Sequence, residues 1–194
     1  MVLAGSGSSK TIFLDRDGVI NRKMSEGDYV KCRDEFKFLP GVKEALRMLK
    51  EAGHLLIVVT NQRGVARGLM TEDELREIHG YMQQELDEIG ASLDGIYYCP
   101  HEKGQCNCRK PELGLFLKAK YDFPSICFAN SIMIGDSIND MEAGVKIGCK
   151  NVLVADTSQN TSIVNKAYNQ GIDIEIIIPT LYDILFYLDG DLFL

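Results

Sequence analysis

The feature that most constrains the fold is a series of short apolar runs, each followed at once by polar residues. Ile12-Phe13-Leu14 leads into Asp15-Arg16-Asp17-Gly18-Val19, and later runs lead into clusters that begin at Thr60, Cys99 and Asp136. Runs without an interrupting polar residue are typical of strands buried on both faces, as in parallel sheets. In open α/β sheets the carboxyl ends of such strands face the ligand crevice. The sequence therefore predicts an α/β protein with its functional residues at one edge of a parallel sheet.

Composition is that of a globular protein. The chain has 194 residues, 45% of them hydrophobic and 25% charged, which suits one domain over residues 11–194. Residues 1–10, rich in Gly and Ser, are expected to form a flexible tail. The net charge of −7 argues against nucleic-acid binding, and no apolar run reaches the length of a membrane span. No exposed apolar helix face stands out, so a monomer is expected.

Two carboxylates, Asp15 and Asp17, follow the first apolar run directly. One of them can attack phosphorus as a nucleophile while the other protonates the leaving oxygen. Two anions facing an anionic substrate would repel it unless a cation such as Mg²⁺ lies between them. The alternative is an ordinary strand-end turn with two solvated aspartates, because Asp-x-Asp-Gly is common in turns.

Possible phosphate ligands follow the second run, Leu55–Val59. The Thr60 hydroxyl, the Asn61 amide and nearby backbone N–H groups are suitable donors to phosphate oxygens, although such residues also favour turns and helix starts. The polar segment 21–37 is too long for a plain connector, and we expect it to form a flap over the crevice. Its stretch Glu26-Gly27-Asp28-Tyr29 either meets a substrate or forms a solvated loop.

The strongest metal signal is Cys99-Pro100-His101 followed by Cys106-Asn107-Cys108. Three thiols and an imidazole within ten residues suffice for a tetrahedral, structural Zn²⁺ site. Unligated thiols or a Cys106/Cys108 redox pair are the alternatives. No secretory signal opens the chain, so this clustering indicates metal binding in a reducing compartment, and a cytoplasmic location is expected. The other three cysteines are expected to be small core residues: Cys32, Cys127 and Cys149.

Basic and acidic residues complete the candidate site. Arg109 and Lys110 precede Pro111, which suits the first position of a helix, so both cations are expected just before a helix start. A Lys there can neutralise an attacking carboxylate and a phosphate oxygen together, whereas a solvated basic pair is the alternative. Asp136 follows another apolar run and can ligate Mg²⁺. Asp140 could orient Lys110 or the waters around the metal, or merely cap a helix expected over 141–147.

The remaining elements are expected from periodicity and turn residues. Helices are expected over 42–53 and 71–90, where His79 lies beside the apolar stripe and is interpreted as structural. Strands are expected over 95–98, 131–135 and 152–155. Beyond them the chain predicts a short helix near 163–168, a strand-like stretch over 172–178 and a helix from Leu181.

Four motifs now occur in a recognisable order between residues 10 and 155: Asp-x-Asp-Gly-Val, the strand-end Thr60, Lys110 before Pro111, and Gly-Asp-Ser-x-x-Asp at 135–140. Together they resemble the motifs of haloacid dehalogenase (HAD) superfamily phosphatases. The Thr-Asn-Gln stretch and the Cys/His loop resemble the zinc-containing histidinol-phosphate and heptose-bisphosphate phosphatases, and segments 64–68 and 93–101 are most similar to the latter. The resemblance implies a three-layer Rossmann-like fold with helices on both faces of the sheet, order 3-2-1-4-5, and no large cap domain.

The resemblance also implies roles for individual residues. Asp15 would be the nucleophile that forms an aspartyl-phosphate, and Asp17 the general acid and then base. Thr60 and Lys110 would stabilise the transferring phosphoryl group, and Arg109 would recognise the substrate. Catalytic Mg²⁺ would be held by the Asp15 carboxylate, the Asp17 backbone carbonyl and Asp136. Structural Zn²⁺ would be held by Cys99, His101, Cys106 and Cys108. The expected substrate-binding residues are Asn21, Asp28, Tyr29, Asn61, Gln62, Arg63, Arg67 and Arg109.

The function implied is Mg²⁺-dependent removal of the 7-phosphate of D-glycero-D-manno-heptose 1,7-bisphosphate, a small sugar phosphate. That step would serve nucleotide-activated heptose biosynthesis for lipopolysaccharide core or surface glycans. Arg67 and Arg109 favour a substrate with a second phosphate. Histidinol-phosphate phosphatase is the alternative, because Asp28 and Tyr29 suit an imidazolium and the short stretch between His101 and Cys106 is closer to those enzymes. 

Two further alternatives lie outside this pair. A polynucleotide 3′-phosphatase shares the Asp-x-Asp and Thr-Asn features, but the acidic surface argues against it. A catalytically silent zinc-binding interaction module would have no need of the intact set Asp15, Asp17, Thr60, Lys110 and Asp136.

Overall fold

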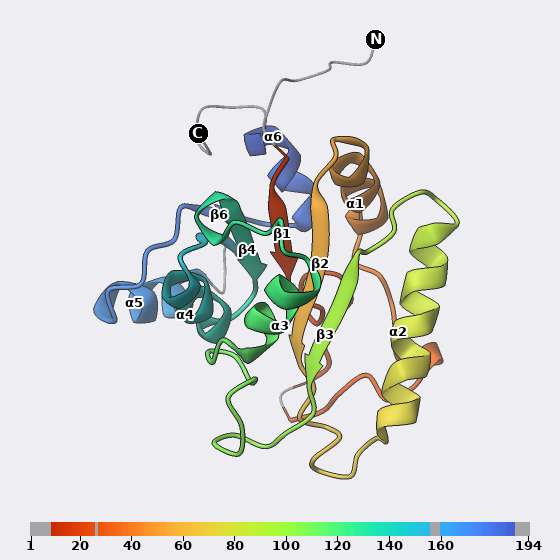
Figure 1. Cartoon of the computed structure of the whole chain (residues 1–194). Coiled ribbons are helices and arrows are strands. Elements are labelled where there is room, and N and C mark those ends of the chain that lie inside the picture. Colours follow the sequence, from red (N-terminus) through yellow and green to blue (C-terminus); the bar gives the residue numbers. More distant parts are fainter. Residues whose placement is uncertain (1–8, 26, 156–159, 189–194) are drawn as a thin grey trace.

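A six-stranded parallel sheet lies at the centre of the computed structural model, which describes residues 9–25, 27–155 and 160–188 (Figure 1). The spatial order is β3-β2-β1-β4-β5-β6, and every neighbouring pair is parallel. This confirms the predicted α/β class and the order 3-2-1-4-5, and it adds β6 beside β5. The strands are β1 Thr11–Leu14, β2 Leu55–Asn61, β3 Gly95–Cys99, β4 Ser131–Gly135, β5 Lys150–Val154 and β6 Ile176–Ile178.

Helices cover both faces of this sheet, so the three-layer arrangement is confirmed (Figure 1). Ile12 and Leu14 pack toward α1, α2 and the C-terminal helical segment, whereas Phe13 packs toward α3 and α4. The buried β1 pattern thus follows from alternating side chains that are apolar on both faces. The helices are α1 Val42–Glu51, α2 Glu72–Asp87, α3 Gly114–Asp122, α4 Ile138–Ile147, α5 Asn160–Asn169 and α6 Leu185–Leu188, with short 3-10 helices at Arg33–Glu35, Phe128–Asn130 and Leu181–Ile184.

Two helix starts differ from the prediction. α3 begins at Gly114 rather than Pro111, because the backbone of Lys110 is hydrogen-bonded to Asn61 and residues 109–113 form turns instead. α4 begins at Ile138 rather than at residue 141, because Ser137 is its N-cap and the acidic residue three positions later completes a capping box. The predicted strand over 172–178 pairs with β5 only from Ile176.

Among the described residues of the segment 21–37, only Arg33–Glu35 form a helix, a short 3-10 one, and the described part of the chain includes no inserted cap domain. Asn21 makes isolated bridges to Asp17 and Phe38, which fix the start of this segment beside the end of β1. Glu26 and residues 1–8 of the expected tail lie outside the described residues, whereas the Ser9 hydroxyl donates a hydrogen bond of 2.6 Å to the Gly53 carbonyl. None of the described helices has the length and apolarity that a membrane span requires.

Candidate active site

The carboxyl ends of β1, β2 and β4 bring the predicted catalytic residues together. Leu14 pairs with Val58 on one side and Ile134 on the other, so the residues that follow each strand emerge side by side. The backbone N–H of Asp15 donates to the Ile134 carbonyl at 2.9 Å, which holds Asp15 against the end of β4. The strand register therefore brings the residues at the ends of β1, β2 and β4 to the same edge of the sheet.

Lys110 reaches into this cluster from the loop before α3 and is buried there. Its Nζ lies 2.8 Å from Asp15 Oδ1, 2.5 Å from Asp140 Oδ1 and 2.6 Å from the Val59 carbonyl oxygen. Burial alone would lower the pKa of Lys110, but Asp140 and Asp15 outweigh it and leave the pKa above its usual range. A permanently charged ammonium group therefore lies beside the candidate nucleophile.

Asn61 holds the backbone of Lys110 in place. Its Nδ2 donates to the Lys110 carbonyl at 3.0 Å, and its Oδ1 accepts from the Lys110 N–H at 2.9 Å. We predicted that this amide binds substrate; in the structure its nitrogen and its oxygen each form a hydrogen bond with the Lys110 backbone. Asp140 also contacts Lys110, through its Oδ1. Its Oδ2 accepts a hydrogen bond of 3.0 Å from the Ser137 N–H, so the same side chain pairs with the lysine and caps α4.

The Asp17 carboxylate accepts hydrogen bonds from three side chains. Arg16 Nη2 is 2.9 Å from both oxygens, Asn21 Nδ2 is 2.8 Å from Oδ1, and Gln62 Nε2 is 2.7 Å from Oδ2. Gln62 Nε2 also lies 3.0 Å from the buried Thr60 Oγ1. Burial raises the pKa of Asp17, but Arg16 and these hydrogen bonds outweigh it and lower the pKa overall. The amides of Asn21 and Gln62, expected at the substrate, therefore support Asp17.

Three carboxylates gather where a metal ion was predicted. One oxygen each from Asp15, Asp136 and Asp140 lies within 4.8 Å of the others. Burial is the main influence on Asp15 and Asp136 and raises the pKa of both, with further increases from neighbouring carboxylates. A divalent cation among them would offset this repulsion, so the donor set fits Mg²⁺. Because Asp17 has its carboxylate engaged elsewhere, its backbone carbonyl is the group that could serve as the predicted ligand.

Gly18 allows this close approach. It has φ +93°, and a Cβ placed there would lie 2.2 Å from Asp136 Oδ2, so a side chain would clash with the carboxylate. Lys23 from the segment 21–37 pairs with the same oxygen at 2.6 Å. The Asp136 carboxylate thus already contacts a cationic group, as expected for a site that binds positive charge.

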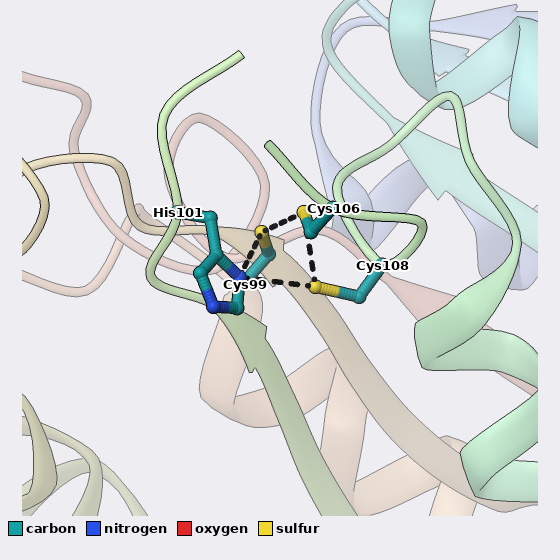
Figure 2. A group of neighbouring side chains, drawn as sticks. All are labelled: Cys99, His101, Cys106 and Cys108. Atoms are coloured by element: carbon teal, nitrogen blue, oxygen red, sulfur yellow. Dashed lines mark hydrogen bonds between the residues drawn. The ribbon is translucent and has the colours of Figure 1, made fainter. Parts of the chain in front are cut away.

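Figure 2 shows the four predicted zinc ligands converging from the end of β3 and the loop that follows it. The sulfur–sulfur distances are 3.5 Å for Cys99 and Cys106 and 3.3 Å for Cys106 and Cys108. His101 Nδ1 lies 3.6 Å from the Cys99 sulfur and 3.4 Å from the Cys108 sulfur. A tetrahedral Zn²⁺ with bonds of about 2.3 Å to sulfur requires edges of about 3.8 Å, and a disulfide requires about 2 Å. The geometry therefore fits zinc and excludes a disulfide.

The prediction for the other three cysteines is wrong in two cases. Cys149 is buried, as expected, but Cys32 and Cys127 are exposed. Both exposed residues are the N-caps of short 3-10 helices at the surface, where a small side chain does not need to reach the core.

Glu102, which the sequence analysis did not single out, joins three loops around the site. It accepts from Arg63 Nη1 at 3.0 Å and from Arg67 Nε at 3.1 Å, and Arg63 Nε also donates to the Tyr29 hydroxyl at 3.1 Å. The segment 21–37, the loop after β2 and the zinc loop are thereby linked. Asp28 instead pairs with its own neighbour Lys31 at 2.8 Å.

Arg109 directly follows the last predicted zinc ligand, Cys108, in the chain. Its Nη1 is buried and has no hydrogen-bond partner among the described residues. An unpaired buried guanidinium nitrogen is costly, so this nitrogen is well suited to an anionic ligand.

The fold and this set of strand-end residues define a HAD phosphatase, and comparison with known proteins agrees. A model of the family "Polynucleotide kinase 3 phosphatase" matches residues 10–182. A relative from Haemophilus influenzae, D-glycero-beta-D-manno-heptose-1,7-bisphosphate 7-phosphatase, is 45% identical over 154 residues, which are 75% of this chain and 82% of that protein. The protein of the same name from Escherichia coli K12 is 44% identical over 146 residues, covering 71% and 74%.

Solved structures give the same result. The D,D-heptose 1,7-bisphosphate phosphatase from B. bronchiseptica, complexed with magnesium and phosphate, has a TM-score of 0.79 and 33% identity, covering 92% of this chain and 97% of that one. The enzyme from Burkholderia thailandensis has a TM-score of 0.68 and 27% identity, covering 94% and 100%. The chain belongs to the family that the polynucleotide kinase 3 phosphatase model describes, together with these heptose-bisphosphate phosphatases.

Proposed function

We propose that this protein removes the 7-phosphate of D-glycero-β-D-manno-heptose 1,7-bisphosphate in the cytoplasm, as a step of nucleotide-activated heptose biosynthesis. The observation that carries the proposal is the buried Asp15–Lys110–Asp140 cluster beside Asp17, in a chain 45% identical to a relative of that name. The β anomer is chosen because the relatives' names specify it. 

The chain's own residues account for a two-step transfer. An Asp15 oxygen attacks phosphorus, the bond from phosphorus to the sugar oxygen breaks, and Asp17 donates a proton to that oxygen. Arg16 lowers the pKa of Asp17 in the free protein, so the proposal requires that the negative charge of the bound phosphate raise this pKa and keep Asp17 protonated. Asp17 then takes a proton from water, which attacks the aspartyl-phosphate; the bond from phosphorus to Asp15 breaks and inorganic phosphate leaves. Lys110 and Thr60 would stabilise the charge on the phosphoryl oxygens. Bound Mg²⁺, held by Asp15, Asp136 and the Asp17 carbonyl, would neutralise negative charge at this site.

A second phosphate on the substrate accounts for the surrounding arginines. Arg109 has a buried nitrogen without a hydrogen-bond partner among the described residues. Arg63 and Arg67 each form an ion pair with Glu102, where the three loops meet. A phosphate dianion is well matched by guanidinium groups, whereas the imidazolium of histidinol phosphate would be repelled by them. We therefore place the sugar and its 1-phosphate among these loops.

Phosphate release tests the proposal. We expect kcat/KM with Mg²⁺ to be highest for the β anomer of heptose 1,7-bisphosphate, compared with the α anomer, histidinol phosphate and a 3′-phosphorylated oligonucleotide. Omitting Mg²⁺ is the control. A preference for histidinol phosphate or the oligonucleotide would contradict the substrate while leaving the chemistry intact. Zinc binding without activity on any of the four would instead support the silent interaction module.

We also propose a structural Zn²⁺, and metal analysis tests it. One zinc per chain is expected in protein purified without chelator, and Cys106→Ser should lose it because one of four ligands is missing. Cys149→Ser, at a buried cysteine outside the cluster, is the matched control and should keep the metal. Zinc loss should lower the melting temperature by about 5 °C or more. Full zinc content in Cys106→Ser would contradict this site.

A further inference from the structure

Arg16, between the two catalytic aspartates, is fully buried and is among the largest side chains of the interior. A buried guanidinium group is expensive unless its N–H groups are paired. One end of this group is paired with the Asp17 carboxylate at 2.9 Å and with Gln62 Oε1 at 3.3 Å. These contacts all involve Nη2, so a partner at Nη1 is needed to hold the guanidinium group in one orientation.

That partner is His79, which comes from the buried face of α2. Arg16 Nη1 lies 3.0 Å from His79 Nε2, and Arg16 Nε has no partner among the described residues. His79 is 6% exposed, and its ring lies against Tyr98 with centroids 5.5 Å apart. Its helical neighbours Ile78 and Met82 fill the apolar core, so His79 contributes the polar contact of this helix to the site.

The protonation state of His79 suits it to accept a hydrogen bond from a cation. Burial, and next the Arg16 charge, lower the pKa of His79 to about 3, so the ring is neutral near pH 7. Because Arg16 has only N–H donors, Nε2 must present its lone pair and the ring proton must lie on Nδ1. An apolar residue at this position would leave the Arg16 Nη1 buried without an acceptor.

We propose that His79 is a positioning residue for phosphoryl transfer: it holds Arg16, and through Arg16 it fixes the Asp17 carboxyl group toward the leaving oxygen. The inference rests on the proposed function and adds a residue that is not in contact with substrate. Asn21 and Gln62 each donate to a single oxygen of Asp17, whereas Arg16 contacts both. Loss of the Arg16 anchor would therefore leave the carboxyl group free to turn.

The leaving group gives a readout that separates positioning from stability. A sugar alkoxide needs the proton from Asp17, whereas p-nitrophenolate and acetate leave without one. The ratio kcat/KM covers only the steps up to departure of the leaving group, so it excludes hydrolysis of the aspartyl-phosphate. We expect His79→Leu to lower kcat/KM about 10-fold or more for the sugar bisphosphate. For p-nitrophenyl phosphate and acetyl phosphate the loss should stay within about 3-fold.

Conservative and matched variants complete the test. His79→Gln keeps an acceptor for Arg16 and should restore most of the sugar bisphosphate activity. Met82→Ala, which removes a fully buried side chain from the same helix, should lower the activity on all three phosphates to the same extent. Should His79→Leu fail to fold, Arg16→Lys takes its place, because it keeps the charge but cannot contact His79 and Asp17 at once.

The outcomes distinguish this inference from the proposed function. The positioning role would be overturned if His79→Leu, or Arg16→Lys in its place, lowered kcat/KM equally for all three phosphates or did not lower it at all. If wild-type protein hydrolyses neither the sugar bisphosphate nor the activated phosphates, the proposed function itself fails. A selective loss on the sugar bisphosphate with rescue by His79→Gln is the result that supports the inference.

Discussion

Asp15→Asn is expected to lower kcat by about 10⁴-fold or more, the order of loss seen when an enzyme's nucleophile is removed. The amide oxygen of Asn is a far weaker nucleophile than a carboxylate, and no other described carboxylate has both the Lys110 contact at 2.8 Å and a position directly after β1. Phosphate release measures the loss. Acid-quenched wild-type protein, mixed with substrate labelled in the 7-phosphate, should carry label on Asp15, and the variant should carry none.

A matched carboxylate shows that the effect is local. Asp87→Asn changes an exposed residue at the end of α2 and should leave kcat unchanged. Lys110 keeps Asp140 as a partner in Asp15→Asn, so the variant should fold. Activity within about 10-fold of wild type would show that Asp15 is not the nucleophile.

The strands were the most predictable part of this fold, for a physical reason. A strand covered on both faces must be apolar at every position, and that requirement is visible in Ile12–Leu14 and 55–59 without knowledge of tertiary contacts. The starts of α3 and α4 were less predictable, because contacts between distant residues set them. Asn61, which lies 49 residues before Lys110 in the chain, fixes the backbone of Lys110, and α3 therefore begins only after residue 113. Asp140, which pairs with Lys110, also caps α4.

The candidate site likewise contains residues whose proximity was predictable from the sequence and residues that only tertiary contacts bring together. Asp15 and Asp136 directly follow β1 and β4, and Thr60 is the second-last residue of β2, so the proximity of these strand ends could be inferred from strand order alone. The contact of Arg16 with His79 spans 63 residues, and a histidine on the apolar face of a helix has the same sequence pattern as an ordinary core histidine. Glu102 lies in a loop without periodicity, so only the fold brings it to its arginine partners.

Lys110→Met is expected to affect activity and stability together. The phosphoryl group and Asp15 would lose a preorganised cation, which should lower kcat/KM about 10²- to 10³-fold. Asp15 and Asp140 would remain close together and buried without the charge that pairs them, at a cost of about 3–5 kcal/mol in the free energy of unfolding. Phosphate release and urea unfolding measure the two effects. Lys146→Met, which breaks an exposed pair with Glu142, is the control and should cost at most about 1 kcal/mol.

The stability deficit of Lys110→Met should also depend on pH. Burial raises the pKa of Asp15 even in the wild-type protein, where Lys110 opposes the increase, so loss of Lys110 should raise it further. A carboxyl group whose pKa in the folded protein is above its unfolded value of about 3.9 binds a proton more tightly in the folded state. The free energy of unfolding therefore falls as the pH rises from the unfolded pKa to the folded pKa. The gap in unfolding free energy between wild type and Lys110→Met should therefore be larger at pH 8 than at pH 5. A gap that is equal at both values, with Lys146→Met unchanged, would mean that Asp15 does not depend on Lys110 for its charge.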